Sequence, residues 1–236
     1  MRALNNIRIG GLILSRFDSQ RLPGKTLLNL GTKPLIKWPI DALNSHPNIL
    51  PIITTTNRPI DNPLMDIEPI DRILSYRGDT LDIAKRIIDC CSEYNLDYFF
   101  RVNGDSPFIN IPLLTQAIAL LNHSKFDIIT NLINRSYPYG LSCELIKVST
   151  FSSLYSKFSD FQKEHITDFY YKNLNKITFA ELPILDKNYS KLDWAVDTKE
   201  DLERLSSYIS KTSYKDINTT DITELIIDYE KHNKAE

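Results

Sequence analysis

Apolar residues occur in short runs that end in polar or turn-forming residues. Such runs cover residues 7–14, 49–56, 98–102, 126–130 and 141–148, and the second is rich in β-branched residues. Short apolar runs with these boundaries are typical of strands buried on both faces of a sheet. The pattern therefore predicts a strand at each of them.

Between and after these runs, apolar residues recur at the spacing of amphipathic helices. Pro34 suits the first turn of a helix, and Ile83, Ile87, Ile88 and Cys91 fall on one face of another. Strands that alternate with helices predict an α/β fold, with a mostly parallel central sheet and helices on both faces. The length suits a single domain over residues 1–236. The predicted helices cover about 34–43, 79–94, 112–121, 161–172, 198–210 and 220–232.

The composition excludes several classes of partner. Of the 236 residues, 42% are hydrophobic and 25% are charged, and the net charge is -2. This balance provides no basic surface for nucleic acid and no field that attracts an anionic membrane. No apolar run reaches the ~18 residues of a membrane span, and no signal-peptide hydrophobic region is apparent. Cys90, Cys91 and Cys143 lack metal-ligand spacing, so we expect reduced, packed thiols in a cytoplasmic protein.

The most informative segment is the polar loop after the first predicted strand. It reads SRFDSQRLPGK and places Arg16, Arg21 and Lys25 within ten residues, with Pro23-Gly24 directly before the lysine. Such a loop can bring several cations and free backbone N–H groups to one side of a triphosphate. The G-x-x-x-x-G-K-[ST] spacing of a Walker P-loop is absent. From charge alone, a solvated basic loop fits equally well.

Two aspartates also follow predicted strands, Asp105 within Gly-Asp-Ser-Pro and Asp197 within Val-Asp-Thr. Ligands of open parallel sheets bind beyond the carboxyl ends of the strands, where Arg16 and Asp105 are expected. Mg²⁺ prefers a few carboxylates together with phosphate oxygens and water, so these aspartates and a triphosphate could hold it. Alternatively, Asp197 or Thr198 caps the helix at 198–210, and Asp105 is a turn residue ahead of Pro107.

The loop resembles a known signature. S-R-F-D-S-Q-R-L-P-G-K is similar to the A-R-x-x-S-x-R-L-P-G-K motif of cytidylyltransferases that make CMP-activated sugars: the CMP-Kdo and CMP-sialic acid synthetases and a spore-coat-polysaccharide type. The resemblance implies a GT-A-like nucleotidyltransferase fold and a homodimer. It also implies a nucleotide-binding part at about 1–110 and an acceptor-binding and dimerisation part at about 111–236. The similarity to the spore-coat type continues in order through ITTTN (53–57), YRGD (76–79), RVNGDSP (101–107), YPYGL (137–141), EHIT (164–167) and WAVDTKEDL (194–202).

The resemblance also implies roles for individual residues. The loop cations and Ser19 would hold the phosphates of CTP, and Arg16, Lys25 and Asp105 would act in catalysis. Asp105 and Asp197 would bind Mg²⁺. The nucleotide-binding residues expected in this way are Leu14, Ser15, Arg16, Ser19, Arg21, Lys25, Thr55, Arg77, Asn103 and Asp105.

The acceptor side carries weaker signals. His165 matches a histidine that lies near the sugar in the resembling synthetases, although a surface helix histidine also fits. The two tyrosines of YPYGL could stack on a sugar or only pack their loop. Spore-coat-type relatives usually carry an aspartate before the glutamate where this chain has Cys143, which leaves the acceptor open. The expected acceptor-binding residues are Arg101, Tyr137, Tyr139, Glu144 and His165.

These observations predict an enzyme that transfers CMP from CTP to a small acidic acceptor, a nonulosonic or octulosonic acid, and releases pyrophosphate. A phosphorylated small molecule as acceptor, or a catalytically inactive binding subunit, are the alternatives. A GT-A glycosyltransferase would normally carry a D-x-D metal motif, which Asp18-Ser19-Gln20 does not supply. The joint presence of Arg16, Lys25, Asp105 and Asp197 argues against an inactive relative. No Ser-His-Asp or Cys-His arrangement supports a protein nucleophile.

Overall fold

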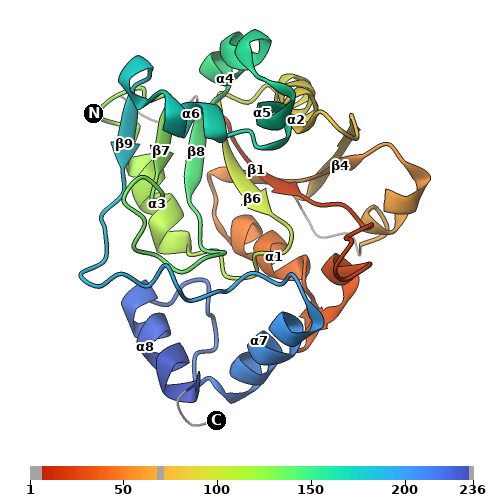
Figure 1. Cartoon of the computed structure of the whole chain (residues 1–236), viewed down its shortest axis with the longest axis vertical. Coiled ribbons are helices and arrows are strands. Elements are labelled where there is room, and N and C mark those ends of the chain that lie inside the picture. Colours follow the sequence, from red (N-terminus) through yellow and green to blue (C-terminus); the bar gives the residue numbers. More distant parts are fainter. Residues whose placement is uncertain (1–6, 68–71, 234–236) are drawn as a thin grey trace.

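The computed structural model describes residues 7–67 and 72–233 of the chain (Figure 1). Its strands are β1 (Ile9–Leu14), β2 (Asn29–Leu30), β3 (Lys33–Pro34), β4 (Ile49–Thr56), β5 (Leu74–Gly78), β6 (Tyr98–Asn103), β7 (Ile128–Thr130), β8 (Glu144–Lys147) and β9 (Phe179–Glu181). Its α-helices are α1 (Lys37–Ser45), α2 (Ile83–Glu93), α3 (Ile111–Leu120), α4 (Val148–Leu154), α5 (Asp160–Glu164), α6 (Asp168–Lys172), α7 (Lys199–Lys211) and α8 (Ile222–Asn233). Short 3-10 helices are η1 (Lys25–Leu27), η2 (Pro59–Leu64), η3 (Tyr155–Lys157) and η4 (Leu174–Lys176).

The central sheet has the strand order β5-β4-β1-β6-β8-β7-β9. β1 pairs in parallel with β4 and β6, β4 pairs in parallel with β5, and β7 does so with β9. Only β8 within this sheet is reversed, since it pairs antiparallel with both β6 and β7. The predicted α/β class with a mostly parallel sheet is confirmed.

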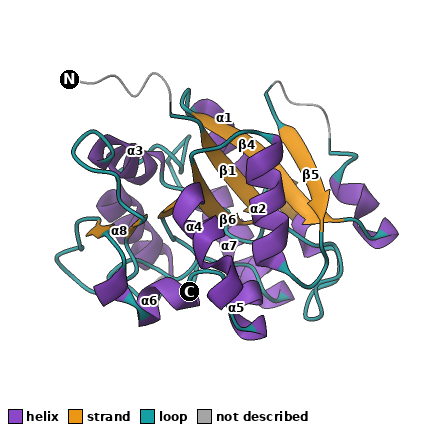
Figure 2. Cartoon of the chain, turned by 90° about the horizontal axis from the view of Figure 1, so that it is seen from above, coloured by secondary structure: helices purple, strands orange, loops and turns teal. Residues whose placement is uncertain are grey.

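Helices cover both faces of the sheet because neighbouring residues of each strand enter opposite cores. Ile13 of β1 and Ile53 of β4 pack with α1, α3, α7 and α8, whereas Leu12 and Ile52 pack with α2, α4 and α6. In Figure 1, α7 and α8 form the lower end of the molecule and α2, α4, α5 and α6 gather at the top. Figure 2 shows α2 and α4 lying across the strands.

The three cysteines are unpaired and buried, as predicted.

Several predicted helix boundaries are wrong. Pro34 does not begin a helix: it pairs with Asn29 in the β2–β3 hairpin, whose turn holds Gly31 at φ 64°. The helix predicted from residue 79 begins at Ile83, because Asp82 caps it by accepting a hydrogen bond from Lys85 N.

Other elements were missed, or joined to their neighbours. The helix predicted at 161–172 is two helices, α5 and α6, that are separated at residues 165–167. β5, β9 and α4 have no counterpart in the prediction. No residue of β5 is fully buried, so its side chains lack the apolar run by which a central strand is recognised.

The order of the sheet places a crevice at the carboxyl end of β1. The chain continues from β1 to β4 on one side and later to β6 on the other, so the two connections diverge there. Leu14 is in register with Thr54 and Asn103. Gly104 N then donates to Leu14 O at 2.9 Å, and a Cβ on Gly104 would lie 2.9 Å from the Ser15 side chain. The loops after β1 and β6 are therefore held against each other.

Across the described residues, no helix has the length and apolar character needed to cross a membrane.

Candidate active site

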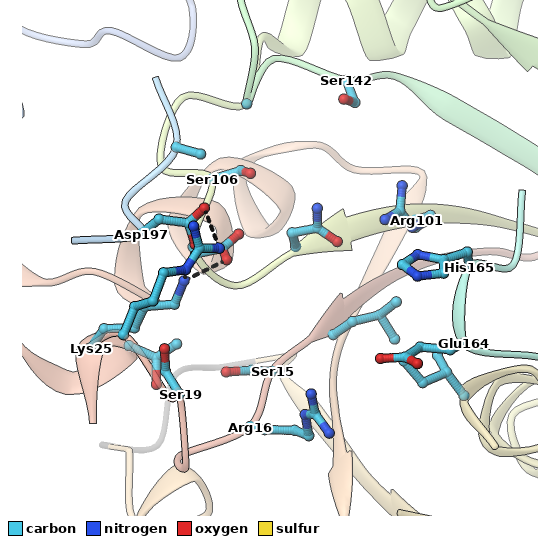
Figure 3. Close-up of a pocket in the computed structure, with 18 of the residues that line it drawn as sticks. Ser15, Arg16, Ser19, Lys25, Arg101, Ser106, Ser142, Glu164, His165 and Asp197 are labelled. Atoms are coloured by element: carbon cyan, nitrogen blue, oxygen red, sulfur yellow. Dashed lines mark hydrogen bonds and ion pairs between the residues drawn. The ribbon is translucent and has the colours of Figure 1, made fainter. Parts of the chain in front are cut away.

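A cavity of about 830 Å³ opens at this crevice. Figure 3 shows Lys25 and Asp197 on one side of it and Arg101, Glu164 and His165 on the other. Among the described residues that line the cavity, six carry a guanidinium or ammonium group and four carry a carboxylate. The excess of positive charge suits a polyanionic ligand.

The loop after β1 is folded into a fixed shape from its base. Asp61 is fully buried, and it accepts hydrogen bonds from Phe17 N at 2.7 Å and from the Arg58 guanidinium at 3.1 Å. Arg58 also donates hydrogen bonds from both of its terminal nitrogens to the Asp18 carboxylate, at 2.6 and 2.8 Å. Gly24 closes the loop by donating to Phe17 O. Its φ of 68° is strained for residues with a side chain, and a Cβ there would lie 3.1 Å from the Phe17 ring. The cations of this loop are thus preorganised, which a freely solvated loop does not provide.

Lys25 is the centre of the charged cluster, and little of it is exposed. Its ammonium donates to Asp105 Oδ2 at 2.8 Å, Asp197 Oδ1 at 2.9 Å and Val196 O at 2.8 Å (Figure 3). Arg21 reaches the other carboxylate oxygen of Asp197 at 2.9 Å. Burial by itself lowers the pKa of the Lys25 ammonium, but the two aspartates outweigh it and the pKa is raised. Segments that are about 170 residues apart in sequence are joined at this ammonium.

The helix cap at α7 is Thr198, not Asp197. The Thr198 hydroxyl accepts from Asp201 N, and the Asp201 carboxylate accepts from Thr198 N, so the two form a capping box. The Asp197 side chain is left to point into the cavity. Of the two roles considered for Asp197, capping is therefore wrong.

The two aspartates form a set of donors that fits a divalent cation. Their carboxylates already meet at one positive charge, the Lys25 ammonium, and hard oxygen ligands suit Mg²⁺. Within residues 7–67 and 72–233, no group of three or more His, Cys, Asp and Glu side chains is arranged to hold a metal. The remaining ligands would have to be phosphate oxygens and water, as is usual for Mg²⁺ at nucleotide sites.

The opposite side of the cavity is built on a buried ion pair. Arg101 of β6 donates through Nη1 to Glu144 Oε2 at 2.7 Å, and Glu144 is fully buried. Tyr171 donates its hydroxyl to the other oxygen of Glu144 at 2.7 Å and lies 2.9 Å from the Thr130 hydroxyl. Burial lowers the pKa of Arg101, but Glu144 more than compensates and the pKa is raised. Arg101 lines the cavity, and Glu144 thereby holds one edge of the Arg101 guanidinium in place.

Aromatic rings and a histidine complete this side. Tyr139 is exposed at 48%, lines the cavity and carries the Arg135 guanidinium 5.1 Å above its ring. His165 follows the last residue of α5 and stacks on Phe161 at 4.2 Å between ring centres. The break between α5 and α6 thus turns His165 toward the cavity.

Comparison with known proteins assigns the family. A model of the cytidylyltransferase family matches residues 11–225, which is most of the chain. The chain belongs to this family. The predicted resemblance and the predicted enzyme class, a CTP-using nucleotidyltransferase, are therefore confirmed.

Named relatives of this cytidylyltransferase include the spore coat polysaccharide biosynthesis protein SpsF of Bacillus subtilis, 22% identical over 91% of this chain and 92% of that protein. An uncharacterised protein of Methanocaldococcus jannaschii is 25% identical over 93% of this chain and 89% of its own length. The 3-deoxy-manno-octulosonate cytidylyltransferase of Bdellovibrio bacteriovorus is 25% identical, but the match spans 52% of this chain and 50% of that protein.

Solved structures agree on the fold. A cytidylyltransferase from Leptospira borgpetersenii superimposes with a TM-score of 0.87 at 27% identity, covering 97% of this chain and 96% of that one. A CMP-2-keto-3-deoxy-manno-octonic acid synthetase in complex with CTP superimposes with a TM-score of 0.62 at 15% identity, over 86% of this chain and 99% of that one. The nucleotidyltransferase fold predicted from the loop motif is confirmed.

Most of the predicted site residues of the cytidylyltransferase lie together. They come from β1, β6 and the loops that follow them, from the start of η1, from the loop between β7 and β8, and from the segments before α6 and α7. The predicted residues that line the cavity are Leu14, Ser15, Arg16, Ser19, Arg21, Lys25, Arg101, Asn103, Asp105, Tyr139, His165 and Asp197.

Four predicted site residues lie elsewhere. Thr55 is fully buried within β4, and Arg77 donates to backbone oxygens of Thr56 and Arg58, so that it joins β5 to the segment before η2. Tyr137 is buried and donates its hydroxyl to Pro183 O at 2.6 Å. This packing position corresponds to the alternative considered for Tyr137. Glu144 lies behind Arg101, with which it forms the buried ion pair.

Two residues that shape the site were missed. Asp61 lies in a polar stretch without any local signal, and only the fold brings its carboxylate under the loop. Arg86 lines the cavity although it is 1% exposed. The sequence did contain a pattern by which Arg86 could have been identified. Arg86 lies on the same helical stripe as Ile83, Ile87 and Cys90, and a cation on an apolar helix face requires an explanation.

Proposed function

We propose that this cytidylyltransferase transfers CMP from CTP to the hydroxyl of an acidic sugar, with Mg²⁺ held at Asp105 and Asp197. The observation that carries the proposal is the division of one cavity into two cationic sides. One side has Lys25 and the loop cations beside the two aspartates, and the other has Arg101 held by a buried carboxylate. The first suits a triphosphate and the second suits the carboxylate of an acceptor.

The chemistry follows from the placement of charge. The acceptor hydroxyl attacks the α-phosphorus and gives its proton to solvent, and pyrophosphate leaves as the bond to the α–β bridging oxygen breaks. Arg16, Arg21 and Lys25 neutralise the phosphates and the charge that grows on the leaving oxygen. Mg²⁺ when bound would polarise the phosphoryl oxygens and add to this stabilisation.

Lys25 and Arg21 have to change partners when the nucleotide arrives. In the structure both cations bind the aspartates that we assign to the metal. A triphosphate competes for these cations, and its binding therefore releases carboxylate oxygens for Mg²⁺. Nucleotide and metal should accordingly bind with positive coupling.

The relatives support an acidic acceptor. Several are named as cytidylyltransferases of 3-deoxy-manno-octulosonate, which is a sugar acid. A mycobacterial protein of similar fold has been solved with manganese, in keeping with a divalent ion. The homodimer, the cytoplasmic location and the division of the chain at about residue 110 stay predictions. A pyrophosphate-release screen with CTP against sugar acids and phosphorylated acids tests the proposal. Turnover with phosphorylated acids alone would replace the acidic-sugar assignment. If none of the acceptors in either panel supported pyrophosphate release, the proposed function would be contradicted.

CTP should be preferred over UTP, ATP and GTP. A ligand that binds only the folded state raises the melting temperature by mass action, so nucleotide selectivity appears as a difference in melting temperature at equal concentration. We expect the largest shift with CTP and Mg²⁺ in a thermal unfolding assay without acceptor. An equal shift with a purine nucleotide would contradict the assignment.

Glu144→Gln should raise the KM for the acceptor about tenfold, with little change in the KM for CTP. The substitution keeps the shape of the side chain but removes the charge that holds Arg101, and about 1.4 kcal/mol of binding corresponds to tenfold. Steady-state kinetics with the acceptor found in the screen measures both constants. Lys172→Gln serves as the control, because Lys172 forms a surface ion pair with Asp168, one turn earlier on the same helix, and does not line the cavity. A rise in the KM for CTP alone would show that Arg101 serves the nucleotide.

A further inference from the structure

Arg86 is a buried cation that the proposed chemistry does not use. It is 1% exposed, on α2, and it lines the cavity. The one hydrogen bond that its side chain makes within the described residues runs from Nη1 to Asp79 O at 3.1 Å, and no ion pair to a described carboxylate accompanies it. Its Nε–H is buried without any partner. Desolvation, and after it the nearby Arg16 guanidinium, lower the pKa of Arg86 to about 10.

A buried guanidinium with unpaired donors is costly, and the fold nonetheless makes room for it. Gly78, the last residue of β5, lies against it: a Cβ there would be 2.9 Å from Arg86 Cγ. Removing a charge from water without pairing it costs several kcal/mol in general. Such an arrangement is expected where a ligand completes the pairing.

The surroundings of Arg86 indicate a flat ligand. Leu14 at the end of β1 and Ile83, one turn before Arg86 on α2, both line the cavity and both pack against the core beneath it. Because so little of Arg86 is exposed, the approach to it is narrow. Apolar side chains beside a buried guanidinium suit the edge and face of an aromatic ring better than a hydrated tetrahedral phosphate.

The free donors of Arg86 distinguish one base from another. With Nη1 bound to Asp79 O, the opposite edge of the guanidinium, Nε–H and Nη2–H, remains as a fork. Such a fork pairs with two neighbouring acceptors. Cytosine presents O2 and N3 as adjacent acceptors, whereas N3 of uracil carries a hydrogen. We propose that Arg86 reads the O2/N3 edge of the cytosine of CTP, and so determines the preference for CTP over UTP.

This inference rests on the proposed function, and it is tested by nucleotide binding without acceptor. Calorimetry with Mg²⁺ is carried out for CTP, UTP and pyrophosphate on the wild type, Arg86→Met and Arg86→Lys. We expect Arg86→Met to bind CTP about 10- to 100-fold more weakly, which is the loss typical of a hydrogen bond to a charged group. Its UTP and pyrophosphate affinities should change less than about threefold, so the CTP/UTP ratio should approach one.

The controls separate reading of the base from the other roles of an arginine. Lys85→Met removes the same charge from the neighbouring position on α2, where Lys85 pairs with Asp89 at the surface, and should leave the ratio unchanged. If Arg86→Met does not fold, Arg86→Lys retains the charge without the fork and should still lose discrimination. An unchanged CTP/UTP ratio in the folded variants would overturn the inference. An equal loss of pyrophosphate affinity would also overturn it, because Arg86 would then be a phosphate ligand. A wild type that does not prefer CTP would instead contradict the proposed function.

Discussion

Lys25→Ala should lower kcat about 10²- to 10³-fold while weakening CTP binding only about tenfold. Arg16→Ala should show the same pattern. Both cations face a triphosphate that is already strongly charged, so each contributes to ground-state binding. The additional charge on the α–β bridging oxygen exists only as that bond breaks, and a preorganised cation directed at it therefore stabilises the transition state more than the substrate. The remaining cations still hold CTP.

The geometry also predicts that Lys25→Arg will not restore activity. The ammonium uses three donors for three acceptors, Asp105, Asp197 and Val196 O, at 2.8 to 2.9 Å. When CTP binds, these donors are expected to turn to phosphate oxygens, and a planar guanidinium cannot direct its donors from one atom to several acceptors as an ammonium does. Steady-state kinetics together with calorimetric CTP affinity on the same proteins checks both variants. Normal turnover of Lys25→Ala and Arg16→Ala would show that the loop is only solvated surface.

Asp105→Asn and Asp197→Asn should each lose about 10²- to 10³-fold in kcat, with the fold preserved. Each substitution keeps the size of the side chain but removes a charged oxygen ligand, and a catalytic metal supplies several kcal/mol of transition-state stabilisation. Mn²⁺ binding in the presence of CTP, followed by electron paramagnetic resonance, should weaken in parallel. This second measurement separates the loss of a metal ligand from the loss of a Lys25 partner.

Thr198→Ala is the matched control for Asp197. Thr198 is the residue that caps α7, so its loss should cost about 1 kcal/mol of stability, or about 2–4 °C in melting temperature, and leave kcat nearly unchanged. The opposite result would reverse the assignment: if Asp197→Asn only lowered the melting temperature and Thr198→Ala reduced turnover, the metal role of Asp197 would be wrong.

The sequence alone was sufficient for the family, the fold class and the enzyme class. The signature at 15–25 is local: a strand, three cations and a Pro-Gly turn within a short span, each with a direct physical meaning. Strands with continuous apolar runs, such as β4 and β6, were predicted within about a residue, because burial on both faces produces a signal that needs no partner. The predicted class, sheet and nucleotide loop all depend on such local signals.

Tertiary structure decided what each charged residue does. Arg77 and Tyr137 carry the same side-chain chemistry as residues that do line the cavity, but long-range packing uses them to join segments instead. Asp61 carries no local signal in the sequence, and Glu144, which was predicted to contact the acceptor, lies behind Arg101 instead. The positions of these two carboxylates, beneath Phe17 and behind Arg101, come from burial in the fold. Burial and partner choice depend on contacts between segments about 20 residues or more apart, which no local pattern encodes.

For the two aspartates and Arg86, the sequence determined which groups were present and the fold determined their targets. Asp197 and Thr198 are adjacent and both could cap α7. Only the capping box between Thr198 and Asp201 left Asp197 free to meet Lys25. Arg86 was visible as a cation on an apolar stripe, but its unpaired donors and its place beside the cavity appeared only once β1, β5 and α2 were packed together. The physical reason is that residue type sets the available charges and donors, whereas distance and desolvation set what those groups can bind.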